Sequence, residues 1–122
     1  MAKQEYFDLE GARKALSWLK KAIKDLEALS SEGEKAMEKY DLDSADAITI
    51  RIHEIIEQIQ ERGIIMRDRD GGLYDFPAVI NNMPAYLCWT TAEDGIQFWH
   101  YADEGFAGRK ELTGNENFLS YL

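Results

Sequence analysis

Four residues in the second half of the chain carry side chains that could do chemistry: Asp75, Cys88, His100 and Arg109. A thiolate and an imidazole both bind zinc and iron, and a thiol beside an imidazole can act as a nucleophile. A carboxylate can complete either kind of site, and the planar guanidinium of an arginine can clamp a carboxylate or a phosphate. We take these four residues as the candidate ligand-binding set and assign no catalytic role within it.

Cys88 and His100 also fit purely structural roles. A cysteine between Leu87 and Trp89 is typically a small buried hydrophobe, and an interior histidine is typically hydrogen-bonded. Cys88 is the only cysteine, and no CxxC or HxxxH spacing occurs. Because a closed metal site needs four ligands, the sequence predicts no metal and implies no particular cofactor. Cys88 and His100, with Asp75 as a third ligand, are the weak candidates for one.

Arg109 has two interpretations, which use the same fork geometry of its guanidinium. It follows the glycine-containing segment 105–108, where it could clamp a small anionic ligand. It could equally bridge its loop to Asp75 or to another acidic residue. The sequence leaves both interpretations open.

The elements that must position these residues fall into two halves of different composition. Residues 1–62 contain no proline and two glycines, whereas residues 63–122 contain both prolines and seven of the nine glycines. The first half has the periodicity of helices, and the second half has that of short strands and turns. We predict one α+β domain over residues 1–122, with a long antiparallel helical hairpin followed by a small antiparallel sheet of about four strands.

The first helix is expected to begin after Asp8, a favoured N-cap residue. Its apolar residues are spaced alternately by three and four, as in a heptad seam. They are Leu9, Ala12, Leu16, Leu19, Ile23 and Leu26. We predict a helix over 8–39 that is weakened or bent around Ser30–Gly33, with a break into two helices there as the alternative.

The second helix follows a short connection, which predicts antiparallel packing against the first helix. Asp43 or Ser44 is its expected N-cap, and Gly63 lies where a left-handed C-terminal residue belongs. The apolar stripes of the two helices are long and narrow, so either the second half or another chain must cover them. The heptad spacing therefore predicts self-association through the hairpin, as a homodimer with coiled-coil character.

Four strands are expected in the second half, joined by glycine-containing turns. Pro77 should end the second strand, because proline cannot donate to a ladder, and 78–84 should form a loop or short turn. The expected strands cover 64–69, 73–76, 85–91 and 96–102.

The registers of the two expected hairpins depend on the lengths of their loops. A three-residue loop in the second hairpin places Cys88 opposite His100, whereas a two-residue loop places Trp89 opposite His100. A three-residue loop in the first hairpin places Arg67 opposite Asp75, which would make a cross-strand ion pair.

Short motifs in the second half resemble those of a family of prokaryotic proteins, the domain-of-unknown-function 2203 family. The matching residues are Gly63, Arg67, Asp68, Gly72, Leu73, Asp75, Phe76, Pro77, Leu87, Cys88, Trp89, Trp99, His100, Gly105, Phe106, Gly108 and Arg109. The chain departs from the family pattern at Thr90, where a basic residue is usual, and at 82–84, where a glycine usually precedes the next strand. A ligand that used the missing basic residue would bind differently here. The resemblance implies a site but no reaction.

The charge balance excludes several classes of function. Fourteen Lys and Arg residues against 23 Asp and Glu residues give a net charge of −9, which opposes binding to nucleic acid and to anionic membrane surfaces. No apolar run approaches the ~20 residues that span a bilayer. The first ten residues contain no apolar signal region, and a lone cysteine forms no internal disulfide, so we expect a cytoplasmic location.

These observations favour a small non-catalytic binding or assembly module. The alternative is a small-molecule or metal-handling enzyme with a pocket around Asp75, Cys88, His100 and Arg109. The alternative requires these side chains to converge on one concave site.

Overall fold

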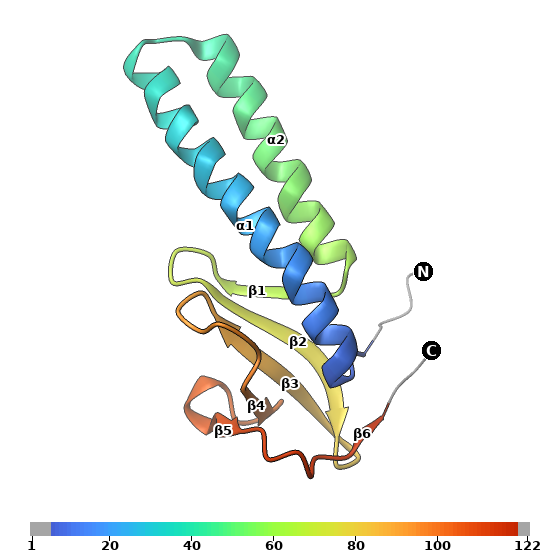
Figure 1. Cartoon of the computed structure of the whole chain (residues 1–122). Helices are drawn as coiled ribbons and strands as arrows, with labels where there is room; N and C mark the ends of the chain where they lie inside the picture. The colour runs from blue at the N-terminus through green and yellow to red at the C-terminus, as the bar shows by residue number, and fades with distance from the viewer. Residues whose placement is uncertain (1–5, 120–122) are drawn as a thin grey trace.

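The computed structural model describes residues 6–119 and has an α+β fold in which a long helical hairpin packs on an antiparallel sheet (Figure 1). The helices are α1 (Leu9–Glu38) and α2 (Leu42–Glu61). The strands are β1 (Ile65–Asp68), β2 (Leu73–Ile80), β3 (Met83–Thr90), β4 (Phe98–Tyr101), β5 (Lys110–Glu111) and β6 (Phe118–Leu119). The strand order is β1-β2-β3-β4-β5, and β6 pairs with β2. The predicted fold class is confirmed, with two very short strands added to the expected four.

The first helix is continuous, as expected for 8–39, and the alternative of a break at Ser30–Gly33 is wrong. The Asp8 carboxylate accepts a hydrogen bond from the backbone N–H of Gly11 at 2.7 Å, so Asp8 is the N-cap that the sequence indicates. Gly33 lies within the helix beside α2, where a Cβ atom would stand 3.4 Å from the Cγ2 of Ile48.

The second helix begins earlier than predicted. Its N-cap is Asp41, whose side chain accepts the backbone N–H of Ser44 at 3.2 Å, so the choice of Asp43 or Ser44 is wrong. The reason lies in the connection. Tyr40 adopts a left-handed φ of 55° and reverses the chain within a few residues. Gly63, with a φ of 82°, follows the end of α2 as expected.

One face of the sheet packs against the helices and forms the core. Alternate residues of β2 and β3 point to this face, and they meet the apolar stripe of α1. The largest buried members of the core include Leu19, Ile59, Tyr74, Phe76, Ile80, Leu87, Trp89 and Trp99. The second half of the chain therefore covers the apolar stripe of α1 at the sheet end, and the heptad seam of α1 is largely buried within its own chain.

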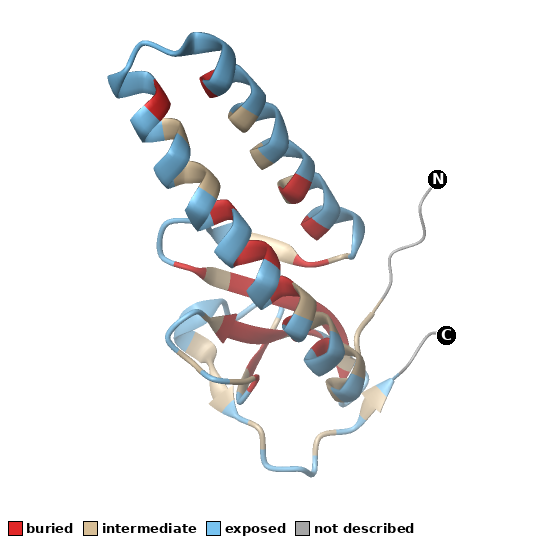
Figure 2. Ribbon diagram, turned by 45° about the horizontal axis from the view of Figure 1, so that its top comes forward, coloured by how far each residue is buried: buried red, intermediate tan, exposed pale blue. Residues whose placement is uncertain are grey.

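The end of the hairpin that is distant from the sheet is mostly exposed (Figures 1 and 2). Four apolar side chains there face solvent, with exposed fractions of 56% at Met37, 87% at Tyr40, 59% at Leu42 and 61% at Ile50. Within residues 6–119, neither helix combines the length and apolar character needed to cross a membrane. Residues 1–5, on which the expected lack of a signal region partly depends, lie outside the described residues.

β2 continues through Pro77, so the expectation that proline would end this strand is wrong. The Pro77 carbonyl accepts the backbone N–H of Phe7 at 2.7 Å. The N–H and C=O of a strand residue point to the same side. The carbonyl of Pro77 points to Phe7, so the proline nitrogen, which has no hydrogen to donate, also faces away from β3. Proline therefore removes no hydrogen bond from the β2–β3 ladder.

The loop or short turn expected over 78–84 is confined to a turn at Asn81 and Asn82, so its predicted extent is wrong. Asn81 and Asn82 have φ angles of 55° and 63°, which suit a tight two-residue hairpin turn. Asparagine tolerates this left-handed region better than most residues. As a result, β2 and β3 extend to Ile80 and Met83, which pair directly.

We predict that Gly33→Ala raises the free energy of unfolding by about 0.5–1 kcal/mol, because alanine is the better helix former and the space beside Ile48 admits a methyl group. Urea unfolding followed by circular dichroism measures the change. The matched control is Gly114→Ala. Gly114 has open space but a φ of 90°, so the same change should cost about 1 kcal/mol. A loss of stability in Gly33→Ala would contradict the packing described for α1 and α2.

Candidate functional site

Three of the four candidate residues meet on the sheet face that points away from the helices. Asp75 of β2 pairs directly with Cys88 of β3, and His100 lies on the adjacent strand β4. Each side chain offers one potential ligand atom: a carboxylate oxygen, the thiol sulfur and an imidazole nitrogen. These three atoms lie within 4.8 Å of one another. All three residues are buried, with exposed fractions of 3%, 0% and 3%.

Both predicted registers of the second hairpin are wrong. His100 pairs with Tyr86, and Cys88 pairs with Phe98, because the connection between β3 and β4 spans residues 91–97 rather than two or three residues. The observed register differs by two residues from the one that paired Cys88 with His100. A shift of two residues keeps every side chain on its face, so Cys88 and His100 still lie side by side.

The Asp75 carboxylate is the centre of the polar contacts. Its Oδ2 atom accepts a hydrogen bond from the Nε atom of Arg67 at 3.0 Å and lies 3.5 Å from the Nε2 atom of His100. Its Oδ1 atom is buried and has no hydrogen-bond partner among the described residues. Buried polar atoms are seldom left without a partner, so this oxygen is available to a ligand.

A pocket of about 300 Å³ opens over this cluster. The three buried residues form part of its wall, and Arg67 and Phe106 lie at more exposed positions around it. Its lining residues are Arg67, Leu73, Asp75, Cys88, His100, Ala102, Gly105 and Phe106. The segment 102–106, which follows β4, thus forms one side of the pocket.

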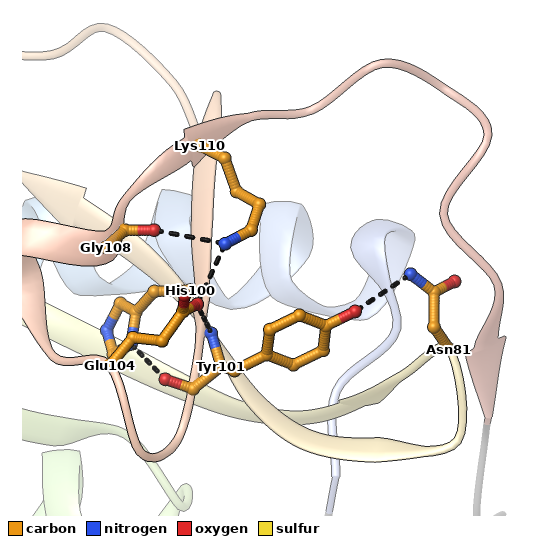
Figure 3. Close-up of polar contacts among 6 residues, drawn as sticks. All are labelled: Asn81, His100, Tyr101, Glu104, Gly108 and Lys110. Atoms are coloured by element: carbon orange, nitrogen blue, oxygen red, sulfur yellow. Dashed lines mark hydrogen bonds and ion pairs between the residues drawn. The ribbon is translucent and has the colours of Figure 1, made fainter.

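The imidazole of His100 is held by a backbone carbonyl. Its Nδ1 atom lies 2.8 Å from the carbonyl oxygen of Tyr101 (Figure 3), and that oxygen also accepts the backbone N–H of Glu104. A carbonyl can only accept, so Nδ1 carries the hydrogen and donates it. The Nε2 atom is therefore the one presented to Asp75 and the pocket.

The segment beyond His100 is fixed by a small polar network (Figure 3). The Glu104 carboxylate accepts the backbone N–H of Tyr101 at 3.0 Å and the ammonium of Lys110 at 2.8 Å. The hydrogen bond from Lys110 lowers the pKa of Glu104, so the carboxylate stays ionised. At the far side, Asn81 donates to the hydroxyl of Tyr101. These contacts hold the carbonyl that orients His100.

The surroundings of Cys88 keep its thiol protonated. Burial raises the pKa of Cys88 to about 12, and the nearby Asp75 carboxylate adds to this effect. A nucleophilic cysteine needs the opposite, a lowered pKa and access to its substrate. In addition, Asp75 rather than His100 lies opposite Cys88 in the ladder. The geometry of a histidine-activated thiol is therefore not favoured.

Arg67, rather than Arg109, lies at the pocket and contacts Asp75. The predicted direct pairing of Arg67 with Asp75 is wrong, because Asp75 pairs with Ile65 and the register shifts between Met66 and Asp68. The irregularity still brings the guanidinium to the carboxylate, and this hydrogen bond raises the pKa of Arg67. The sequence predicted the ion pair between Arg67 and Asp75, but it did not predict that Arg67 would line the pocket.

Arg109 does not line the pocket described above. Its Nη2 atom binds both carboxylate oxygens of Glu93, at 2.8 and 2.6 Å, and its guanidinium stacks over the rings of Phe98 and Phe106. Both charged side chains are largely buried, with exposed fractions of 15% and 16%. An anionic ligand at Arg109 would have to displace Glu93, so the contacts favour the bridging interpretation.

The fold and the site define a small α+β protein with a buried Asp–Cys–His cluster beneath a pocket. The chain belongs to the family described as uncharacterized conserved protein (DUF2203), whose model matches residues 5–112. The match covers both helices and the strands β1 to β5. No curated protein and no solved structure shows a significant similarity to the chain.

We predict that Glu93→Gln lowers the free energy of unfolding by about 2–3 kcal/mol, because it leaves the largely buried guanidinium of Arg109 without its counter-charge. Urea unfolding measures this loss. Glu111→Gln, a change of the same type at an exposed residue of β5, should alter stability by less than about 0.5 kcal/mol. Equal, small effects of the two substitutions would show that the Arg109–Glu93 pair is not structural.

Proposed function

We propose that this chain is a small non-catalytic binding module whose binding site is the pocket over Asp75, Cys88 and His100. The proposal is carried by one observation, the buried Oδ1 atom of Asp75, which has no hydrogen-bond partner among the described residues and lies at a pocket. An unsatisfied buried polar atom costs about 1–3 kcal/mol. Such a cost is typical of sites kept for function rather than for stability.

The size and lining of the pocket support a small ligand or an ion. About 300 Å³ lies at the lower end of the range for small-molecule sites. The guanidinium of Arg67 offers hydrogen-bond donors at the mouth, and Phe106, which is 52% exposed, offers an apolar wall. A net charge of −9 supports a partner other than nucleic acid or an anionic membrane, and the single cysteine supports a cytoplasmic location.

The alternative is a small-molecule or metal-handling enzyme that uses the same pocket. The high pKa and complete burial of Cys88 argue against covalent catalysis by the thiol. The Oδ2 atom of Asp75 and the Nε2 atom of His100 lie 3.5 Å apart at the pocket, so acid–base catalysis by these two groups is the form of this alternative that we retain.

The binding proposal is tested by thermal unfolding of the full chain with separate probes: Zn²⁺, inorganic phosphate and acetate. A probe present at about 100 times its Kd should raise the Tm by about 10 °C. The gain from Zn²⁺ should disappear in Asp75→Asn, and the gain from phosphate or acetate should diminish in Arg67→Gln, which alters a half-exposed side chain. His53→Gln, at an exposed position on α2, is the control and should retain the gain.

Two results would contradict the binding proposal. One is a panel in which no probe raises the Tm of the wild-type chain. The other is a gain that persists unchanged in Asp75→Asn and Arg67→Gln, because the probe would then bind elsewhere.

Self-association through the hairpin is a second candidate function, in which the occupant is another copy of this chain. It is supported by the exposed apolar side chains of Met37, Tyr40, Leu42 and Ile50. Sedimentation equilibrium of the wild type and Ile50→Lys tests it. A dimer that Ile50→Lys converts to a monomer is the expected result. A wild-type chain that stays monomeric over the whole concentration range would remove this candidate.

A further inference from the structure

We infer that Asp75, Cys88 and His100 form a binding site for one divalent transition-metal ion of the Zn²⁺ type, with a fourth coordination position open to the pocket. The inference deepens the proposed function and rests on it, because it names the ligand of the same pocket. Its observations are the convergence of three donor atoms, the orientation of His100 and the unpartnered oxygen of Asp75.

The donor set selects the class of metal. A thiolate, an imidazole and a carboxylate together suit borderline divalent ions, of which Zn²⁺ is the most common in proteins. Mg²⁺ and Ca²⁺ prefer oxygen ligands and several of them, whereas this cluster offers a single carboxylate. Sulfur and nitrogen donors therefore favour zinc or a similar ion over the alkaline-earth ions.

The distances between the donors fit tetrahedral coordination. Metal–ligand bonds of about 2.0–2.3 Å imply donor–donor distances of about 3.3–3.8 Å. The Oδ2 atom of Asp75 and the Nε2 atom of His100 already lie 3.5 Å apart. The three donors lie within 4.8 Å of one another, so small side-chain rotations bring them to bonding distance.

The imidazole of His100 is oriented as a metal ligand requires. Its Nδ1–H donates to the carbonyl of Tyr101 at 2.8 Å, which leaves the Nε2 lone pair of the neutral ring directed at the cluster. Metal-binding histidines almost always donate their other ring N–H to a carbonyl or carboxylate in this way. Asp75 is also oriented by a hydrogen bond from outside the cluster, which the Nε atom of Arg67 donates to its Oδ2 atom at 3.0 Å.

Two acceptor atoms face each other in this cluster, the Nε2 lone pair and the carboxylate, and something positive must lie between them. A second proton on His100 would satisfy that pair as an ion pair. It would not engage the sulfur atom of Cys88, which also lies within 4.8 Å of both partners. A divalent ion instead engages all three side chains at once.

The charges also balance around such an ion. Binding converts the Cys88 thiol to a thiolate, and its proton is released to water. The thiolate and the Asp75 carboxylate then offset the two charges of the metal, while Arg67 adds one positive charge at the mouth. An anionic or water-derived oxygen from the pocket can therefore occupy the fourth position, as in zinc sites with three protein ligands.

The test uses the full chain, freed of metal by a chelator and titrated with Co²⁺ and then with Zn²⁺. Cobalt bound to a thiolate gives a sulfur-to-metal charge-transfer absorption in the near ultraviolet, which a thiol does not give. We expect one Co²⁺ per chain with this absorption, and its loss when one equivalent of Zn²⁺ is added. This part needs no variant, so it does not depend on whether a substitution disturbs folding.

Variants then assign the ligands. Cys88→Ser should abolish the charge-transfer absorption, and Asp75→Asn and His100→Gln should each weaken Zn²⁺ binding by at least about 100-fold, since even loss of an outer contact costs about 10–100-fold. His53→Gln, which changes the other histidine of the chain, is the matched control and should bind as the wild type does. Circular dichroism confirms that each variant is folded.

Three outcomes would overturn the metal inference. They are the absence of stoichiometric binding to the wild type, binding without the thiolate absorption, and binding that His53→Gln removes. If phosphate or acetate still stabilises the wild type through Arg67 while Zn²⁺ and Co²⁺ do not bind, the metal inference fails and the binding module stands. If no probe binds, both fail.

Discussion

The burial of one sheet face against the helices is the constraint on which the rest of the molecule depends. Tyr74, Phe76 and Leu87 are essentially inaccessible there, and each contributes about 1.5–3 kcal/mol through the hydrophobic effect. Because side chains alternate along a strand, fixing these residues toward the helices directs Asp75 and Cys88 to the opposite face. The apolar packing thus places the polar cluster without any polar contact to the helices.

The cluster on the outer face is stabilised only in part. Burying a carboxylate is costly unless it is paired and hydrogen-bonded, and Arg67 supplies one such contact to Asp75. The second oxygen of Asp75 has no partner in the described part of the chain, so the free-energy cost of burying this carboxylate is only partly offset. The Arg109–Glu93 pair nearby is different, because each of its two carboxylate oxygens has a donor. The Nε atom of Arg109 is also buried without a partner in the described part of the chain, but Arg109 does not line the pocket.

The two ends of the molecule carry different possibilities. At the sheet end, the segment 102–106 after β4 forms one side of a pocket whose buried donors can hold an ion. At the far end, the hairpin is mostly exposed (Figure 2), and its exposed residues include the apolar Met37, Tyr40, Leu42 and Ile50. No residue of α1 or α2 lines the pocket, so the two regions have no residues in common.

The sequence by itself determined the features that depend on neighbouring residues. The Asp8 cap, the heptad stripe of α1 and the left-handed Gly63 are short-range effects. Alternation along each strand is also local, but it left two registers open for the second hairpin, and only the one with a three-residue loop placed Cys88 and His100 on the same face. That placement is correct although the register was wrong by two residues, because the side-chain period of a strand is two.

Only the tertiary structure decided the features that depend on distant segments. Pro77 can lie within β2 because the side of its backbone that lacks an N–H faces Phe7 and not β3. The general preference of proline for strand ends does not take this contact into account. The length of the β3–β4 connection sets which residues pair, and the irregularity in β1 brings Arg67 rather than Arg109 to Asp75. Contacts between segments fix these choices, and no local pattern records them. The sequence therefore named the residues of the cluster, whereas the three-strand pairing joined them into one site.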